Sequence, residues 1–203
     1  EGKRVLVIGA GESGSDICNE ISKVAQSTCM VIRGKHGHII PRIQSGGRVT
    51  DLNTNRCRYS NPYILGDWVG WANQKAKRFV AMMGAPNDNN KILQKIGELN
   101  LEQKTSAFSK FGCKNEGFVT AMVKRGAEFH RGAFEFTETG VQFEDGGHYD
   151  CDVVVACTGY KVSYPFFDKY ESKLLAQVQS PRNQFKQIFV PGNPHIAFHG
   201  FAR

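Results

Sequence analysis

Long apolar stretches are absent from this sequence of 203 residues. No run approaches the roughly 20 apolar residues that a helix needs to cross a bilayer, and the first residues lack the pattern of a signal peptide. Within the sequence given, these absences argue against a membrane-spanning helix and a secretion signal. The chain also starts without methionine, with Glu1 leading directly into a strand pattern, so we expect a fragment or a processed chain.

Cysteine pairs of the CxxC type are also missing. The six cysteines are scattered without ligand-like spacing to a histidine: Cys18, Cys29, Cys57, Cys113, Cys151 and Cys157. Such thiols are typical of a reducing, intracellular compartment, and we assign none of them to metal or redox chemistry. His195 and His199 have a zinc-like spacing, but Pro194 argues against the helix that this spacing requires. The sequence therefore predicts no metal site, and no nucleophile–base arrangement indicates a catalytic side chain.

A dense basic block is absent as well, although the net charge is +7. The lysines and arginines are scattered, so we expect no nucleic-acid partner, and a phosphorylated cofactor accounts for part of the excess charge. Internal repeats and low-complexity tracts are also lacking. The hydrophobic content of 40% and the charged content of 22% are typical of a globular protein with a buried core.

The first third of the chain begins with a strand, a helix and a second strand. Residues 3–8 and 28–32 are short continuous apolar runs, as in the buried strands of a parallel sheet. Between them, residues 13–24 carry apolar side chains at helical spacing. This order predicts the βαβ unit of dinucleotide-binding folds, with its right-handed crossover.

The middle and the end of the chain extend this α/β pattern. Residues 41–58 are expected to form a loop, 63–83 a helix with one apolar stripe, and 91–108 further helical turns. Trp68 and Trp71 are expected to fill the core or a domain interface. Residues 128–130 predict a strand, and residues 133–137 and 141–144 begin a β-meander that ends in a fully buried strand at 151–156. We therefore predict a Rossmann-like domain over 1–160, with a helical insertion at about 58–112.

A glycine-rich turn connects the first strand to the first helix. In this GxGxxG pattern, Gly9 allows the tight turn, Gly11 leaves room for a pyrophosphate, and Gly14 lets the helix lie close to the strand. The helix start, with Glu12 and Ser13, presents backbone N–H groups to the phosphates. The pattern favours dinucleotide binding. The alternatives are a turn that only packs helix on strand, or a site for another nucleotide-like ligand.

The end of the second strand distinguishes between dinucleotides. NAD- and FAD-binding proteins usually have an acidic residue there, whereas this chain has Arg33, followed by Lys35 and His36. A guanidinium can hold a 2′-phosphate through two parallel hydrogen bonds. We therefore predict that Arg33 binds the 2′-phosphate of NADPH and that Lys35 and His36 belong to the same cofactor site; the alternative is a surface arginine that caps the strand.

Three stretches together carry a resemblance to a known family. Residues 2–17 resemble the NADPH-binding segment of flavin-dependent monooxygenases of the flavin-containing and Baeyer–Villiger group. Residues 152–160 are similar to the family's Ala-Thr-Gly-Tyr stretch, with Cys157 in place of alanine, and residues 191–201 resemble its Pro-x-x-Pro…Phe-x-Gly-Phe segment. The resemblance is strongest to the members that oxygenate nitrogen and sulfur, and it implies that Thr158 and Gly159 lie at the cofactor site.

The family also has a second glycine-rich turn for FAD and an FxGxxxHxxx signature, and this sequence contains neither. The resemblance implies a two-dinucleotide flavoprotein whose FAD site lies mostly outside this chain, with residues 161–203 returning toward the flavin domain. In the complete enzyme NADPH would reduce FAD, and the reduced flavin would react with O₂ to a hydroperoxide that oxidises a small-molecule substrate. The isolated chain is expected to be inactive, and the natural protein to be intracellular, cytoplasmic or membrane-associated through an anchor elsewhere.

Two other functions remain open from the sequence. One is the NAD(P)H-binding domain of a reductase-type flavoprotein, which a redox CxxC would favour. The other is a non-catalytic nucleotide-sensing domain.

Overall fold

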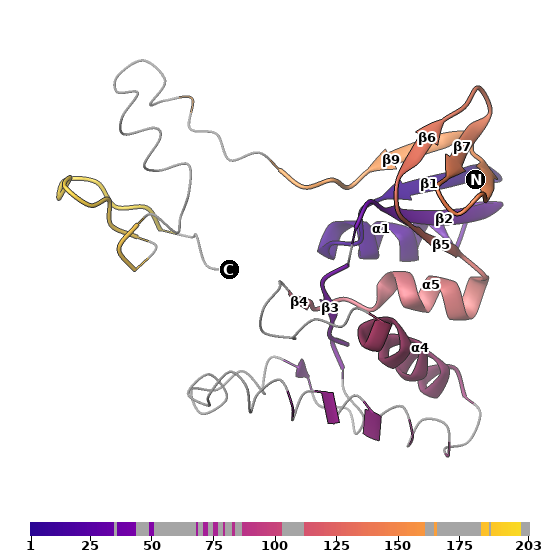
Figure 1. Cartoon of the computed structure of the whole chain (residues 1–203), viewed down its shortest axis with the longest axis horizontal. Helices are drawn as coiled ribbons and strands as arrows, with labels where there is room; N and C mark the ends of the chain where they lie inside the picture. Colours follow the sequence, from indigo (N-terminus) through magenta and orange to yellow (C-terminus); the bar gives the residue numbers. More distant parts are fainter. Residues whose placement is uncertain are drawn as a thin grey trace. The chain divides into compact units, whose positions relative to one another are not determined.

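The computed structural model describes residues 1–34, 36–43, 49–50, 87–102, 112–160, 184–186 and 188–199, together with residues 68, 71–72, 75–76, 79, 83 and 165. The chain divides into two units, Glu1–Gly159 and Tyr160–Arg203. The elements of the first unit (Figure 1) are β1 (Arg4–Ile8), α1 (Glu12–Ile21), β2 (Ser27–Ile32), β3 (His38–Ile39), α4 (Asp88–Glu102), β4 (Gly112–Cys113), α5 (Gly117–Arg125), β5 (Glu128–Arg131), β6 (Phe134–Phe136), β7 (Gly140–Phe143), β8 (His148–Asp150) and β9 (Val153–Ala156).

A four-stranded parallel sheet forms the centre of the first unit. Its strand order is β5-β2-β1-β9, so the first strand of the chain is an inner strand. This arrangement confirms the predicted βαβ unit. Helix α1 ends at Ile21 rather than near residue 24, and the hydroxyl of Ser22 donates a hydrogen bond to the carbonyl of Asn19.

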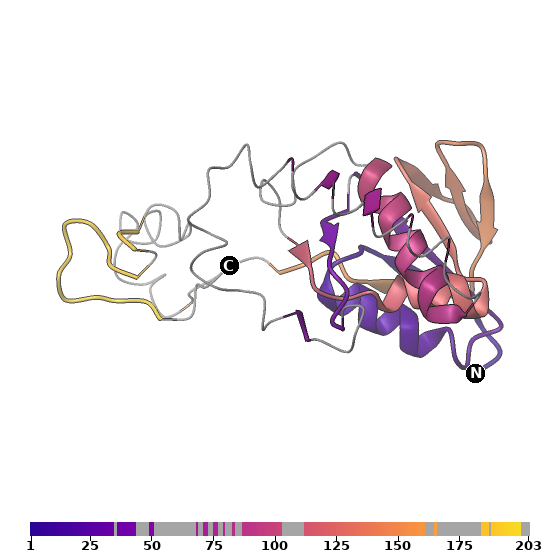
Figure 2. The ribbon, with the colours of Figure 1, turned by 90° about the horizontal axis from the view of Figure 1, so that it is seen from below.

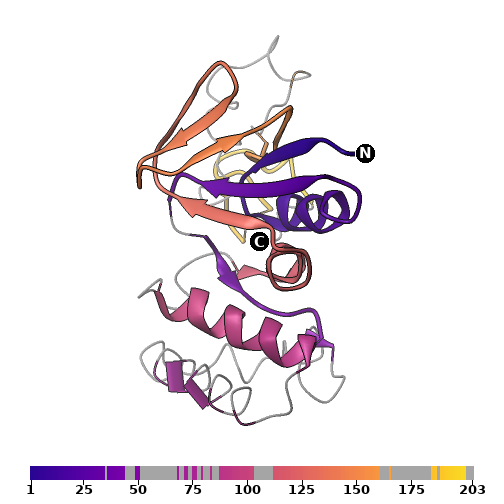
Figure 3. The ribbon, with the colours of Figure 1, turned by 90° about the vertical axis from the view of Figure 1, so that its right-hand side faces the viewer.

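The inner strands are apolar on both sides because both faces of the sheet are covered. On one face Val5, Val7, Met30 and Ile32 pack in a core cluster with residues of α1, α4 and α5. On the other face Leu6, Cys29 and Val31 pack with Val141, Phe143 and Tyr149 of the antiparallel β6–β8 meander. Figure 3 shows the helices and the meander on opposite sides of the sheet.

The helices lie beside one another, with α5 between α1 and α4 (Figure 1), and Figure 2 shows the same helices from below. Helix α4 starts three residues before the predicted start because the side chain of Asn87 accepts a hydrogen bond from the backbone N–H of Asn90, as a helix cap does. The predicted helical residues 103–108 lie outside the described residues. Among the described residues, no helix is long and apolar enough to span a membrane.

The last strand of the sheet differs from the prediction. The meander and β9 are present, but the expectation of a fully buried final strand is wrong. Val153 and Val154 are 41% and 43% exposed. β9 is exposed because it is the last strand in the sheet order. The prediction was wrong because the apolar sequence of β9 resembles that of an inner strand.

The predicted helix 63–83 is described only in part. Its described residues, Trp68, Trp71, Ala72, Lys75, Ala76, Phe79 and Met83, are helical. Trp68 and Trp71 are 68% and 52% exposed, so they do not fill the core of this chain, and a role at a domain interface stays a prediction. In the second unit, Phe189 forms single antiparallel bridges with Phe185 and Ala197, and His195 and His199 do not lie on a helix.

Candidate functional site

The turn between β1 and α1 depends on two glycines for its shape. Gly9 has a φ of +105°, a backbone conformation that residues other than glycine rarely adopt. A Cβ there would also lie 2.4 Å from the carbonyl oxygen of Cys157. A Cβ on Gly14 would lie 1.9 Å from the carbonyl oxygen of Gly9. The predicted roles of Gly9 in the tight turn and of Gly14 in close helix–strand packing are therefore confirmed by the geometry.

Gly11 occupies a different environment. It is exposed and precedes α1 as its N-cap residue, without a side-chain capping bond, and a Cβ there would meet no atom of the described residues within 4 Å. Glu12 and Ser13 are exposed beside it. The helix start is thus open to an anion on the side where a pyrophosphate is expected. The Glu12 carboxylate accepts a hydrogen bond from the backbone N–H of Lys114 at 2.5 Å, so this side chain is held by the segment before α5.

Two buried side chains fix the start of α1 against the start of α5. The Ser15 hydroxyl donates to the carbonyl oxygen of Asn115 at 3.2 Å and accepts from the N–H of Phe118 at 3.0 Å. The Asn115 amide donates to the carbonyl of Glu12, and its side-chain oxygen accepts from the N–H of Gly117. The sequence indicates neither residue, since the contact joins positions about 100 residues apart and no local pattern reveals it.

Asp16, on the exposed side of α1, is held by Arg42. The Arg42 guanidinium contacts the two carboxylate oxygens of Asp16 at 3.0 and 3.1 Å, and its backbone N–H donates to Glu116 at 2.9 Å. The neighbouring carboxylates, Asp16 first, raise the pKa of Arg42. These contacts connect the segment after β3 to the two helix starts.

The predicted phosphate-binding residues lie after β2. Arg33 follows the last residue of that strand and is exposed, as a ligand contact requires, whereas Lys35 lies outside the described residues. His36 is only 3% exposed, and its Nδ1 lies 2.7 Å from the carbonyl oxygen of Gly37. Burial lowers the pKa of His36, which argues against a positive charge on this ring near neutral pH. A cofactor contact of Arg33, Lys35 or His36 stays a prediction.

Arg131, which no sequence motif indicates, ends the neighbouring strand β5. It is the register partner of Ile32, its guanidinium lies 5.3 Å from the ring of Phe129, and its Nη1 pairs with Glu102 at 3.0 Å. Its Nε and Nη2 are buried and have no hydrogen-bond partner among the residues that the structure describes. Buried guanidinium donors without partners are rare in proteins, which makes Arg131 a candidate ligand-binding residue.

These features lie at one edge of the sheet. The glycine turn follows β1, Arg33 follows β2, and the exposed residues Thr158 and Gly159 follow β9. The strands are parallel, so their carboxyl ends are at the same edge, which is where open α/β sheets bind ligands. The structure thus places most of the predicted site residues at one edge, and their contacts with a cofactor stay predictions.

Comparisons with known proteins agree with this architecture. The sequence model of the flavin-binding monooxygenase-like family matches residues 1–201. The 4-hydroxybenzoate brominase (decarboxylating) of Marinomonas mediterranea is 30% identical over 209 residues, which cover 100% of this chain and 38% of that protein. Human flavin-containing monooxygenase 3 is 31% identical over 199 residues, which cover 94% of this chain and 33% of that protein.

Among solved structures, an oxidized steroid monooxygenase bound to NADP is similar with a TM-score of 0.50 and 18% identity, covering 79% of this chain and 39% of the other. This likeness supports the predicted α/β, Rossmann-like fold. The chain spans between 33% and 38% of the length of these curated relatives. Because the family's sequence model matches nearly the whole chain, this protein belongs to the flavin-binding monooxygenase-like family.

Proposed function

We propose that this chain is the NADPH-binding domain of an FAD-dependent monooxygenase that uses NADPH and O₂ to oxygenate nitrogen- or sulfur-containing small molecules. The observation that carries the proposal is the exposed Gly11–Ser13 helix start, at the carboxyl edge of a parallel sheet, in a chain that belongs to this family. The steroid monooxygenase of similar fold is bound to NADP, which adds support for the cofactor.

The geometry of the turn fits a pyrophosphate. The open space at Gly11 is where a Cβ would stand between the backbone and a ligand, and the uncapped start of α1 offers N–H groups to an anion. Exposed Arg33 after β2 supplies the charge that a 2′-phosphate needs, where NAD-binding proteins have a carboxylate. Thr158 and Gly159, after β9, complete this edge.

The rest of the natural protein would hold FAD, and FAD would supply the reaction with oxygen. The residues of this chain bind and orient NADPH, so that hydride transfer to the flavin starts from a fixed position. The partners are therefore the flavin domain of the same protein and the small-molecule substrate.

The domain assignment is part of the same proposal. Residues 1–160 form the NADPH-binding domain, with the helical insertion at about 58–112, and residues 161–203 lead back to the flavin domain. The division of the chain after Gly159 supports this boundary. The family resemblance supports the choice of nitrogen and sulfur substrates.

Titration calorimetry with NADPH and NADH tests the cofactor assignment. We expect the complete protein to bind NADPH more tightly than NADH, and Arg33→Ala to reduce this preference at least tenfold, which corresponds to about 1.4 kcal/mol. Comparable affinities for the two nucleotides, or an unchanged preference in the variant, would show that Arg33 does not read the 2′-phosphate. Substrate-dependent NADPH oxidation with incorporation of oxygen from O₂ tests the monooxygenase assignment separately.

A further inference from the structure

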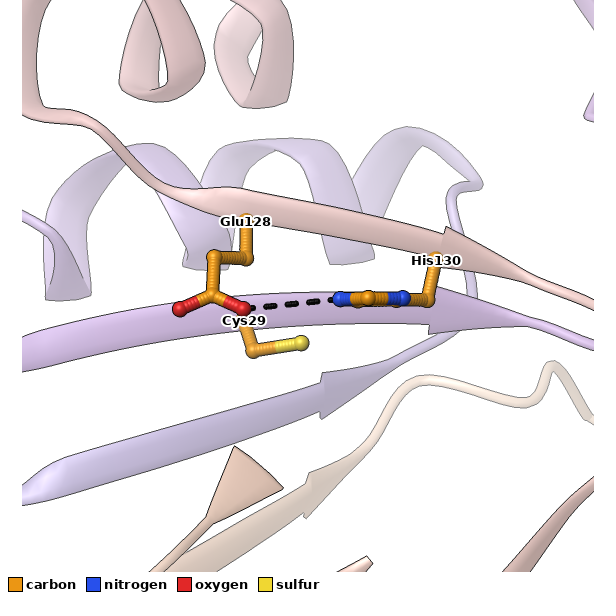
Figure 4. Close-up of side chains that lie close together, drawn as sticks. All are labelled: Cys29, Glu128 and His130. Atoms are coloured by element: carbon orange, nitrogen blue, oxygen red, sulfur yellow. Dashed lines mark hydrogen bonds and ion pairs between the residues drawn. The ribbon is translucent and has the colours of Figure 1, made fainter. Parts of the chain in front are cut away.

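A group of three potential metal ligands lies on the sheet face opposite α1. Cys29 is on β2, and Glu128 and His130 are on the neighbouring strand β5 (Figure 4). Cys29 and Glu128 are register partners, and residues two apart on a strand point to the same side, so the fold brings the three side chains together. The spacing of cysteines and histidines along the sequence could not indicate this group, because about 100 residues separate Cys29 from His130.

The three donors form a set that suits zinc. The thiol sulfur, a carboxylate oxygen and an imidazole nitrogen all lie within 4.8 Å of one another. Ligand atoms around tetrahedral zinc lie about 3.3–3.8 Å apart, given metal–ligand distances of about 2.0–2.3 Å. Side-chain movements on the order of 1 Å therefore bring the donors to coordination distance. Glu128 is exposed, His130 is partly buried and Cys29 is buried, so an ion would have to enter from the side of Glu128.

The orientation of His130 is the second observation. Its Nδ1 lies 3.2 Å from Asp145, and its ring stacks on Phe143 with centroids 3.9 Å apart and planes inclined by 8°. Its other nitrogen, Nε2, lies 3.4 Å from Glu128 and faces the group. Histidines that bind zinc usually donate their second N–H to a carboxylate in this way, which fixes both the tautomer and the ring.

We propose that Cys29, Glu128 and His130 bind a zinc ion, with water at the fourth position and Asp145 as the residue that orients His130. On binding, the Cys29 thiol releases its proton to solvent, and the ion replaces any proton held between His130 Nε2 and Glu128. The ion joins β2 to β5, and through Asp145 it also fixes the turn between β7 and β8. The group lies on the face of the sheet that carries the β6–β8 meander, and the proposal does not depend on the proposed function.

Cobalt titration of the chain tests the site, because a cobalt–thiolate bond gives a charge-transfer absorption band. We expect the band in the wild type, its loss in Cys29→Ser, and its retention in Cys18→Ser, which changes a buried cysteine of α1 in the core cluster on the other side of the sheet. Zinc should displace the cobalt and raise the melting temperature, and EDTA should reverse the rise. Absence of the band, or its persistence in Cys29→Ser, would mean that these side chains are only neighbours on a sheet.

Two further variants keep the test decisive if Cys29→Ser does not fold. Glu128→Gln changes an exposed ligand and should weaken zinc affinity without unfolding the chain. Asp145→Asn keeps an oxygen for the backbone N–H of Gly147 but removes the carboxylate next to His130, and should weaken affinity about tenfold. Unchanged zinc affinity in both variants would overturn the proposal.

Discussion

The hydroxyl of Ser15 and the backbone of Asn115 hold the starts of α1 and α5 together inside the core. Ser15 is fully buried, donates to the Asn115 carbonyl at 3.2 Å, and accepts from Phe118 at 3.0 Å. A Cβ on Gly117 would lie 2.6 Å from the Ser15 carbonyl oxygen, so the two helices also approach each other closely here. The start of α1, where we place the pyrophosphate, is thus positioned by a residue that does not touch the ligand.

Replacing Ser15 with alanine should destabilise the chain by about 1–3 kcal/mol, because the N–H of Phe118 remains buried without an acceptor. Denaturant unfolding measures the loss. Ser13→Ala, in the same helical turn but exposed, is the matched control and should have little effect. Equal stability of the two variants would show that the Ser15 bonds contribute nothing net to folding.

Substitutions at Gly14 and Gly11 should have different effects on the stability of the chain and on NADPH binding. Gly14→Ala places a Cβ 1.9 Å from the Gly9 carbonyl oxygen, so the helix must shift, and we expect a loss of about 1–3 kcal/mol in unfolding free energy. Gly11→Ser places its Cβ in open space and adds a favourable N-cap, so its melting temperature should be unchanged or higher.

The same Gly11→Ser variant should lose NADPH affinity, because its side chain stands where the backbone must approach the pyrophosphate. Calorimetric titration and thermal unfolding of the two variants give the comparison. A stable Gly11→Ser chain that binds NADPH like the wild type would place the pyrophosphate elsewhere.

The part of the fold that local periodicity encodes was predictable. The continuous apolar strands β1 and β2 and the glycine turn between them were identified from sequence because their signals lie within a few residues of one another. Exposure of β9 was not predictable, since an edge strand with Val153 and Val154 has the same composition as an inner one. Burial of His36 likewise depends on tertiary contacts with residues distant in sequence, such as Phe129.

In the candidate site, too, residues that a local pattern marks were predictable, and residues that depend on tertiary contacts were not. Arg33 was selected because its position after β2 has a known meaning in this fold. Arg131 could not be selected, because its importance depends on buried nitrogens and on the pairing of β5 with β2, neither of which the sequence states. Cys29 and His130 also lie close together because of the tertiary fold, and no sequence motif indicates this.

Arg131 should contribute to nucleotide binding if its Nε and Nη2, which have no partner among the residues that the structure describes, face the cofactor. Arg131→Lys keeps the charge but removes the planar guanidinium, and we expect NADPH affinity to fall about tenfold while the fold persists. Arg125→Lys, which changes an arginine that binds Asn19 and Ser22 instead, is the control and should bind NADPH normally. Equal NADPH affinities of the two variants, measured by calorimetry, would remove Arg131 from the site.

Asp152 should make the stability of the chain depend on pH in a narrow acidic window. Its carboxylate accepts hydrogen bonds from the backbone and guanidinium of Arg4, both at 2.8 Å, which join the starts of β9 and β1. These bonds lower the pKa of Asp152 from 3.8 to about 2. A carboxyl group with a lowered pKa in the folded state stabilises it fully above its unfolded pKa, and this contribution disappears as the pH falls through the folded value.

The wild type should therefore lose stability between pH 3.8 and about 2, and Asp152→Asn should show a shallower loss over the same window, starting from a lower melting temperature at neutral pH. Thermal unfolding in steps of pH measures both curves. Glu138→Gln, which alters an exposed carboxylate between β6 and β7, serves as the control and should follow the wild-type curve. If the Asp152→Asn and wild-type curves ran parallel through this window, the pairing with Arg4 would not be the source of the acid sensitivity.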